Sequence, residues 1–257
     1  MLNYNELENI ARFKKLSLPN SEKDYLQDII LFSIYSYAGR DLVFKDGTCL
    51  YKVYKLNRFS EDLDFTTKKI DAKKLADKIV KDLALLNIKS KVKELQVYRD
   101  EINIRLLING PLYKGSKETQ CFIPLNISMK EQVVLEPKKE LVFSLYKEVP
   151  SFEVFAMQEE EILAEKVRAI MTRNKARDIY DLWFLLEKNI DFDSELVNNK
   201  LVLYNLKFNM NEFKNKIEKM KGFWQADLKN LMLQEIEFGE VKARIFDKLD
   251  NRNNNKK

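Results

Sequence analysis

The hydrophobic pattern of the first 150 residues alternates between the helical and the extended period. Two helices are expected at the start of the chain, the second beginning at Ser21 and Asp24, which resemble a capping box, and ending at Gly39. A short apolar step at residues 42–44 precedes a further stretch of helical spacing at residues 49–56. Asp71 is the expected N-cap of the next helix.

Strands are predicted from the same pattern of hydrophobic and polar positions. Residues 58–66 alternate polar and apolar side chains, which predicts a strand. Three more strands are predicted at residues 92–98, 102–108 and 120–128, with a hairpin turn at residues 109–116.

The pattern becomes helical from about residue 151 and stays so to about residue 249. It is clearest at residues 157–173 and 176–187. The sequence therefore predicts an α+β fold, with a mixed β-sheet and flanking helices in residues 1–150 and an all-α domain in residues 151–250. Residues 251–257 contain nothing to bury and are predicted to be a disordered tail.

The most informative feature of the composition is that histidine is absent from all 257 residues. This excludes Ser-His-Asp and Cys-His nucleophiles, HExxH zinc sites and the zinc deaminase signature. The six glycines include no set at GxGxxG spacing, which argues against a dinucleotide-binding Rossmann turn. Any chemistry must come from carboxylates, lysines, arginines, hydroxyls or a bound metal.

The charge balance permits an anionic partner without requiring one. Lys plus Arg number 45 and Asp plus Glu number 40, which gives a formal net charge of +5. Basic runs such as Lys89, Lys91 and Lys93 form either solvated faces or contacts along an RNA backbone. With two cysteines and no apolar stretch of about 18 residues, a reduced cytoplasmic protein without a membrane partner is expected.

The predicted strand at residues 58–66 carries the strongest candidates for chemistry. Its alternation places Arg58, Ser60, Asp62, Asp64 and Thr66 on one face, which is either a solvated surface or a site. Carboxylates at i and i+2 lie ~7 Å apart, and at ~4 Å their repulsion reaches about 4 kcal/mol at an effective dielectric of about 20. A partly buried pair would need a cation, and Mg²⁺ takes carboxylate oxygens together with phosphate oxygens.

A second candidate is the turn at Gly47 and Thr48, where a short strand gives way to a helix. Backbone N–H groups there and the Thr48 hydroxyl are suited to phosphate oxygens, and Gly47 leaves room for a close approach. In the structural alternative, Gly47 turns the chain and Thr48 caps the helix.

Four segments of the chain resemble the motifs of a known family, in the family's order. Residues 45–52 (KDGTCLYK) and 58–66 (RFSEDLDFT) resemble the first two motifs of the AbiEii/AbiGii toxin family of nucleotidyltransferases, distant relatives of the DNA polymerase β superfamily. Residues 165–169 (EKVRA) and 176–183 (ARDIYDLW) resemble the third and fourth motifs. The resemblance covers about residues 20–235 and implies a nucleotidyltransferase-like sheet domain followed by a helical domain that completes the active-site cleft.

The resemblance also implies roles for individual residues. Asp62 and Asp64 would bind Mg²⁺ (or Mn²⁺), and Gly47, Thr48 and Ser60 would contact the triphosphate. Lys166 would approach the nucleotide phosphates, and Asp178 would complete the catalytic set. The supporting residues would be Arg58, Asn126, Arg177 and Asp181.

Lys166 and Asp178 each also have an interpretation in which the residue is structural and has no role in catalysis. Lys166 could belong to a solvated i,i+4 charge ladder, and Asp178 could be a first-turn residue favoured by the helix dipole.

The implied activity is Mg²⁺-dependent transfer of a nucleoside monophosphate from an NTP to an acceptor hydroxyl, with a tRNA 3′ end as one acceptor. The chain would be the toxin of a toxin–antitoxin pair whose antitoxin is a separate protein. Two departures from the family pattern favour an alternative, an inactive nucleotide-binding or protein-interaction module of the same fold. Asp46 stands where the family usually has glycine, and Asn126 stands where relatives often carry a third carboxylate.

Overall fold

The computed structural model describes residues 2–232 and 235–254, with side chains as far as residue 250. The chain forms two compact units. Unit 1 comprises residues 1–53, 59–132 and 137–157, and unit 2 comprises residues 54–58, 133–136 and 158–257.

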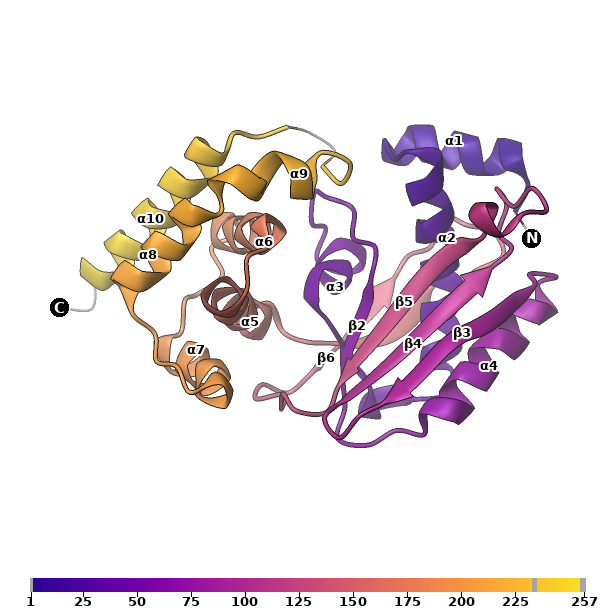
Figure 1. The fold of residues 1–257 in the computed structure, drawn as a ribbon, viewed down its shortest axis with the longest axis horizontal. Coiled ribbons are helices and arrows are strands. Elements are labelled where there is room, and N and C mark those ends of the chain that lie inside the picture. Colours follow the sequence, from indigo (N-terminus) through magenta and orange to yellow (C-terminus); the bar gives the residue numbers. More distant parts are fainter. Residues whose placement is uncertain (1, 233–234, 255–257) are drawn as a thin grey trace. The chain divides into compact units, whose positions relative to one another are not determined.

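Unit 1 is built on a mixed seven-stranded β-sheet with helices (Figure 1). Its elements in chain order are α1 (Tyr4–Lys14), α2 (Leu18–Tyr35), the 3₁₀ turn η1 (Gly39–Asp41), β1 (Val43–Lys45), α3 (Asp46–Lys52), β2 (Leu63–Thr66), α4 (Ala72–Leu85), β3 (Ser90–Val97), β4 (Glu101–Ile108), the 3₁₀ turn η2 (Lys117–Thr119), β5 (Cys121–Ser128), β6 (Lys138–Val142) and β7 (Phe152–Ala156).

The strand order of this sheet is β3-β4-β5-β2-β1-β7-β6. Two pairs, β2 with β5 and β1 with β7, are parallel, and the other four pairs are antiparallel. Strand β2 therefore lies near the middle of the sheet, between β1 and β5, where its backbone is hydrogen-bonded on both sides.

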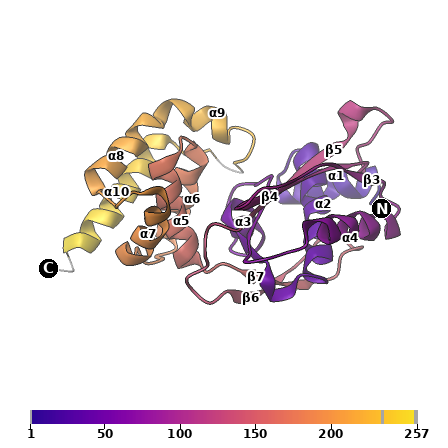
Figure 2. The same ribbon diagram turned by 60° about the horizontal axis from the view of Figure 1, so that its bottom comes forward.

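The core of unit 1 lies between one face of this sheet and helices α2 and α4. Every second residue of β4 is buried, from Ile102 to Ile108, and β5 buries Ile123, Leu125 and Ile127 in the same way. Helix α2 contacts β5 and β7, and α4 contacts β3 and β4. Figures 1 and 2 both show α4 alongside these strands. The α+β fold class predicted from the sequence is confirmed.

Helix boundaries differ from the prediction at α2 because another residue caps this helix. The Ser17 side chain accepts a hydrogen bond from the Asn20 N–H, and Pro19 lies in the first turn. Ser21 and Asp24 are therefore buried inside the helix and do not begin it. The helix ends at Tyr35, and Gly39 begins η1. The predicted cap at Asp71 is confirmed, since its side chain accepts from the Lys74 N–H.

The largest error in the predicted strands concerns residues 58–66. Strand β2 contains only Leu63–Thr66, so the five polar residues from Arg58 to Thr66 do not share one strand face. Arg58 instead belongs to unit 2, where it forms an isolated β-bridge with Met232. Thr66 is buried, and its hydroxyl donates to the Glu131 carbonyl at 2.7 Å.

Two strands, β6 and β7, were not predicted. Strand β7 extends the sheet into residues that the pattern assigned to the helical half, so unit 1 ends at Met157 and not at residue 150.

Unit 2 is helical. Its elements are α5 (Glu159–Thr172), α6 (Ala176–Glu187), α7 (Ser194–Leu201), the 3₁₀ turn η3 (Val202–Tyr204), α8 (Met210–Lys219), the 3₁₀ turn η4 (Lys221–Phe223), α9 (Trp224–Leu228) and α10 (Phe238–Asn254). The bounds of α6 match the predicted helix. Helix α10 continues to Asn254, which places helical backbone where a disordered tail was predicted from residue 251. Residues 255–257 of that tail lie outside the described residues.

Two further expectations concern cysteines and membranes. Cys49 and Cys121 are both buried, and no disulfide joins them in the described structure. Among the described helices, none has the length and apolar character that crossing a bilayer requires.

Candidate active site

The acidic residue Asp64 occupies a central position in the sheet of unit 1. In β2 it is registered opposite Lys45 of β1 on one side and Asn126 of β5 on the other. The Asn126 side-chain amide donates a hydrogen bond to Asp64 Oδ1 at 2.9 Å. Asn126 thus orients the carboxylate and uses its N–H₂ group to do so, which leaves its carbonyl oxygen as the atom suited to a metal.

The environment of Asp64 disfavours its charge. The pKa of Asp64 is raised to about 7, chiefly by burial and also by the charges of Asp46 and Asp62, while the Asn126 hydrogen bond and Lys45 act to lower it. Three carboxylates therefore act on one another in unit 1. A cation among them would remove the repulsion.

Asp46 is the carboxylate that sequence reasoning did not place in the site. It has a backbone φ of 62° at the start of α3, and its Oδ1 accepts a hydrogen bond from the Gly47 N–H at 2.8 Å. This left-handed conformation costs glycine nothing and is tolerated by Asp and Asn, which accounts for the glycine usual in the family. The departure from glycine was the signal that could have identified Asp46.

Replacing Asp46 with asparagine is expected to lower the pKa of Asp64 by about one unit, because a unit charge several ångströms away contributes on that order. Asparagine tolerates the same backbone conformation and keeps an oxygen for the Gly47 N–H. Carboxyl-carbon NMR of selectively labelled protein would follow the titration. A midpoint unchanged from wild type would show that the Asp46 charge does not reach Asp64.

The loop that carries Ser60 and Asp62 is fixed by two buried side chains. Thr48 is fully buried, and its hydroxyl donates to the Asp62 carbonyl. Gln27 of α2 donates to the carbonyls of Ser60 and Glu61 at 2.9 and 3.0 Å. Thr48 therefore links the first two motifs. Gln27 was not predicted, and no local pattern in the sequence identifies it.

Helix α3 is anchored to α2 by an ion pair buried in unit 1. Lys52 Nζ lies 2.6 Å from Asp24 Oδ1 and 2.5 Å from Asp28 Oδ1. Burial acts to raise the pKa of Asp24, but Lys52 and Lys14 outweigh it and hold the pKa at about 2. The lysine that ends the first motif thus holds in place the helix that begins with Asp46 and Gly47.

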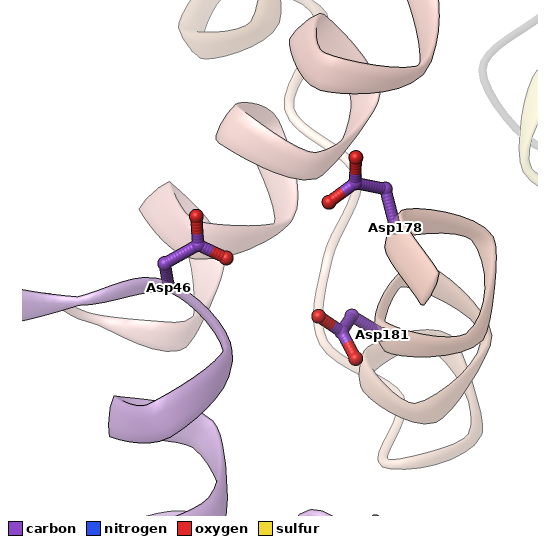
Figure 3. Close-up of side chains that lie close together, drawn as sticks. All are labelled: Asp46, Asp178 and Asp181. Atoms are coloured by element: carbon purple, nitrogen blue, oxygen red, sulfur yellow. The ribbon is translucent and has the colours of Figure 1, made fainter. Parts of the chain in front are cut away.

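A second group of predicted residues gathers within unit 2. Figure 3 shows Asp178 and Asp181 projecting from α6 one turn apart. Lys166 of α5 is 2% exposed, and its Nζ lies 2.7 Å from Asp181 Oδ2 and 3.3 Å from Asp178 Oδ1. Burial at this level rules out the solvated charge ladder as a description of Lys166.

Two arginines complete this group, the buried Arg58 and the partly exposed Arg173. Arg58 holds Asp181 with two hydrogen bonds, from Nε at 2.7 Å and Nη2 at 2.6 Å. Arg173 holds Asp178 in the same bidentate manner, at 2.7 and 2.8 Å. The two bidentate contacts come from Arg58 and Arg173, and a role for Arg177 in holding the aspartates stays a prediction. Arg173 was not predicted, although it stands directly after α5 and five residues before Asp178.

The predicted residues therefore fall into two groups. Gly47, Thr48, Ser60, Asp62, Asp64 and Asn126 belong to unit 1, and Arg58, Lys166, Arg177, Asp178 and Asp181 belong to unit 2. The donors in unit 1 are carboxylate and amide oxygens, the hard ligands that Mg²⁺ and Mn²⁺ take, and with no histidine and two buried cysteines the chain lacks the usual set for zinc. The donor set fits a magnesium-type cation.

Comparison with solved structures shows the same fold elsewhere. JHP933 from Helicobacter pylori has a TM-score of 0.62 at 22% identity, with 91% of each chain covered. MenT4, a nucleotidyltransferase toxin from Mycobacterium tuberculosis H37Rv, has a TM-score of 0.62 at 17% identity, with 94% of this chain and 87% of that chain covered. No curated protein matches the sequence.

The sequence also matches a family model over most of its length. The model describes the nucleotidyl transferase AbiEii toxin of type IV toxin–antitoxin systems, and it matches residues 29–251. This span contains all four motifs on which the resemblance was based. The chain is therefore a member of the AbiEii family of nucleotidyltransferase toxins.

Proposed function

We propose that this protein transfers a nucleoside monophosphate from an NTP to a hydroxyl group of an RNA acceptor, such as a tRNA 3′ end, in a Mg²⁺-dependent reaction. The observation that carries the proposal is the group of mutually repelling carboxylates around Asp64, whose pKa is raised to about 7 by burial, Asp46 and Asp62. Such a group stores unfavourable electrostatic energy that a divalent cation relieves.

Asp62 and Asp64 would hold the metal, with Mn²⁺ as the alternative ion. When bound, the metal would neutralise charge on the transferring phosphate and on the entering and leaving oxygens. The protein's own contribution is positional. Asn126 orients the Asp64 carboxylate through a hydrogen bond. Gln27 and Thr48 hold the backbone of residues 60–62 by donating hydrogen bonds to its carbonyl groups.

Gly47, Thr48 and Ser60 are proposed to contact the triphosphate. The Thr48 hydroxyl hydrogen is used by the Asp62 carbonyl, so Thr48 would meet phosphate through its backbone N–H. Nucleotide transfer needs in-line positioning and charge neutralisation rather than a covalent nucleophile, and the absence of histidine is consistent with such a reaction.

We assign Lys166 and Asp178 to the same reaction on the strength of the family motifs. Within unit 2, Arg58 and Arg173 hold the two aspartates that contact Lys166, so the ammonium group is fixed in one orientation. A fixed cation of this kind would act on phosphate charge without reorganisation.

The test is incorporation of label. Wild-type protein is incubated with each α-labelled NTP, Mg²⁺ and total tRNA, and the RNA is separated on a denaturing gel. Labelled RNA with wild type, and none with Asp62→Ala, supports the transferase. NTP binding without transfer to RNA supports the alternative, a module that kept the fold and lost turnover, which the Asn126 and Asp46 substitutions favour. The cognate antitoxin is expected to be a separate protein, encoded by a neighbouring gene.

The raised pKa of Asp64 predicts how metal binding depends on pH. Below about pH 7 the Asp64 carboxyl holds a proton that must leave before a cation binds. The Mg²⁺ affinity is therefore expected to rise about tenfold per pH unit up to pH 7 and to level off above it. Isothermal titration calorimetry in two buffers of different ionisation enthalpy would measure affinity and proton release together. Equal affinities at pH 5.5 and 8 would contradict this assignment.

A further inference from the structure

Strands β3, β4 and β5 bury one face against α2 and α4, and their other face, the side seen in Figure 1, carries rows of aligned side chains. The strand register places Lys91, Leu107 and Phe122 in one row. Phe122 is 38% exposed, and Lys91 is exposed. An aromatic ring and a basic side chain thus lie together on an exposed part of this sheet surface.

A β-bulge adds a second lysine to this row. The register between β3 and β4 shifts between Val92 and Glu94, which leaves Lys93 as the extra residue. Its Nζ lies 5.5 Å from the centroid of the Phe122 ring. The contact with the Phe122 ring places the ammonium group of the exposed Lys93 on the same surface as Lys91.

Two further rows lead from these residues to the carboxylates of the candidate active site. The second row contains Glu94, Arg105 and Pro124. In the third, the register aligns Gln96, Asn103, Asn126 and Asp64 across four strands. From Phe122 to Asn126 is four residues of β5, about 13 Å at ~3.3 Å per residue.

We propose that this surface, defined by Lys91, Lys93, Arg105 and Phe122, binds the single-stranded 3′ end of the acceptor RNA. Phe122 would stack on a base, the basic side chains would face the phosphates, and the strand would continue along β5 toward Asn126 and Asp64. The inference rests on the proposed nucleotide transfer and specifies where the acceptor lies.

The chemistry of the surface favours RNA over a protein partner. Stacking platforms for single strands combine a basic track with exposed aromatic rings, as sheet surfaces of RNA-binding domains do. The buried centre of a protein–protein interface is usually more apolar than this surface. Three basic side chains and one acidic one, Glu94, lie in the first two rows, so the local charge suits a polyanion.

Fluorescence anisotropy with the full chain and a labelled single-stranded RNA of about 12 nucleotides tests the proposal. The titrations contain EDTA and no NTP, so they do not depend on turnover. Phe122→Ala is expected to weaken binding about tenfold. The Lys91→Ala/Lys93→Ala variant is expected to reduce the slope of log K against log salt by about 1.4, and Glu94→Gln is expected to strengthen binding. Lys73→Ala/Lys74→Ala removes the same charge from exposed positions of α4 and serves as the matched control.

The outcomes separate this proposal from the transfer reaction. RNA binding that weakens as described supports the surface even if no label is transferred, in which case the proposed reaction fails alone. Wild-type affinity and salt slope in the Phe122 and lysine variants, with transfer intact, would overturn the surface and leave the reaction standing. Loss of a co-purifying protein from these variants with RNA affinity unchanged would assign the face to a protein and overturn the RNA assignment.

Discussion

Replacing Asp64 with asparagine is expected to lower the rate of nucleotide transfer at least about a thousandfold while making unit 1 more stable at pH 8. The loss of rate follows from the role proposed for the Asp64 carboxylate, because removing a charged group that stabilises a transferring phosphate costs several kcal/mol of transition-state energy. Asparagine has the same shape and keeps an oxygen for the Asn126 amide, so the local structure has no reason to change.

The gain in stability follows from the pKa of Asp64, about 7 in the folded protein against an ordinary value of 3.8. Between about pH 4 and pH 7 the folded state holds a proton that the unfolded state has lost. Stability therefore falls as the pH rises through this window and stays low above it. Asparagine carries no charge, so Asp64→Asn is expected to stabilise unit 1 by about 1–3 kcal/mol at pH 8 and by nothing near pH 4.

Hydrogen exchange of the β1 and β5 amides measures this gain, because these strands flank β2, which carries Asp64, in the sheet. The control is Asp77→Asn, which removes one carboxylate from an exposed position of α4 and should change neither rate nor stability. An Asp64→Asn protein that transfers nucleotide within tenfold of wild type would remove Asp64 from the reaction. A variant less stable than wild type at pH 8 would show that the carboxylate is not electrostatically strained.

The elements that were predicted well from the sequence are those that bury one continuous apolar face. Helix α6 and strands β4 and β5 each have a continuous apolar face, so their period is clean and their bounds were close to those observed. Strand β6 begins with two exposed lysines at the edge of the sheet, and β7 is five residues long. Neither offers enough alternation to be distinguished from a loop.

The residues of the candidate site also divide into those that the sequence identified and those that it did not. Asp62, Asp64 and Asn126 were identified because a motif named them, and the register then placed Asp64 beside Asn126. Arg58 was assigned to a strand face because it lies six residues before Asp64, yet its partner Asp181 is 123 positions away in the chain. Contacts at such separations depend on the packing of elements, which period and spacing do not encode. Gln27 was missed for the same reason, because its partners lie 33 and 34 positions away in the chain.

The contact between Arg58 and Asp181 leads to the second large effect. Asp181→Asn is expected to destabilise unit 2 by about 3–5 kcal/mol, because it leaves Arg58 and Lys166 buried without the carboxylate that both contact. Arg58 is 1% exposed and Asp181 is fully buried, so water cannot replace the lost interaction. Both tryptophans of the chain, Trp183 and Trp224, lie in unit 2, and tryptophan fluorescence during urea denaturation therefore reports the unfolding of this unit alone.

A matched variant separates burial from charge. Asp250→Asn breaks a pair with Lys214 in the same unit, where the Asp250 side chain is 52% exposed, and should change the free energy of unfolding by less than about 1 kcal/mol. The double variant Arg58→Leu/Asp181→Leu removes both charges of the bidentate pair and should cost less than the sum of its single changes, with a coupling energy of about 2 kcal/mol or more. If Asp181→Asn behaves like Asp250→Asn, the network is solvated in solution. It could not then hold Lys166 in the fixed orientation on which its assigned role depends.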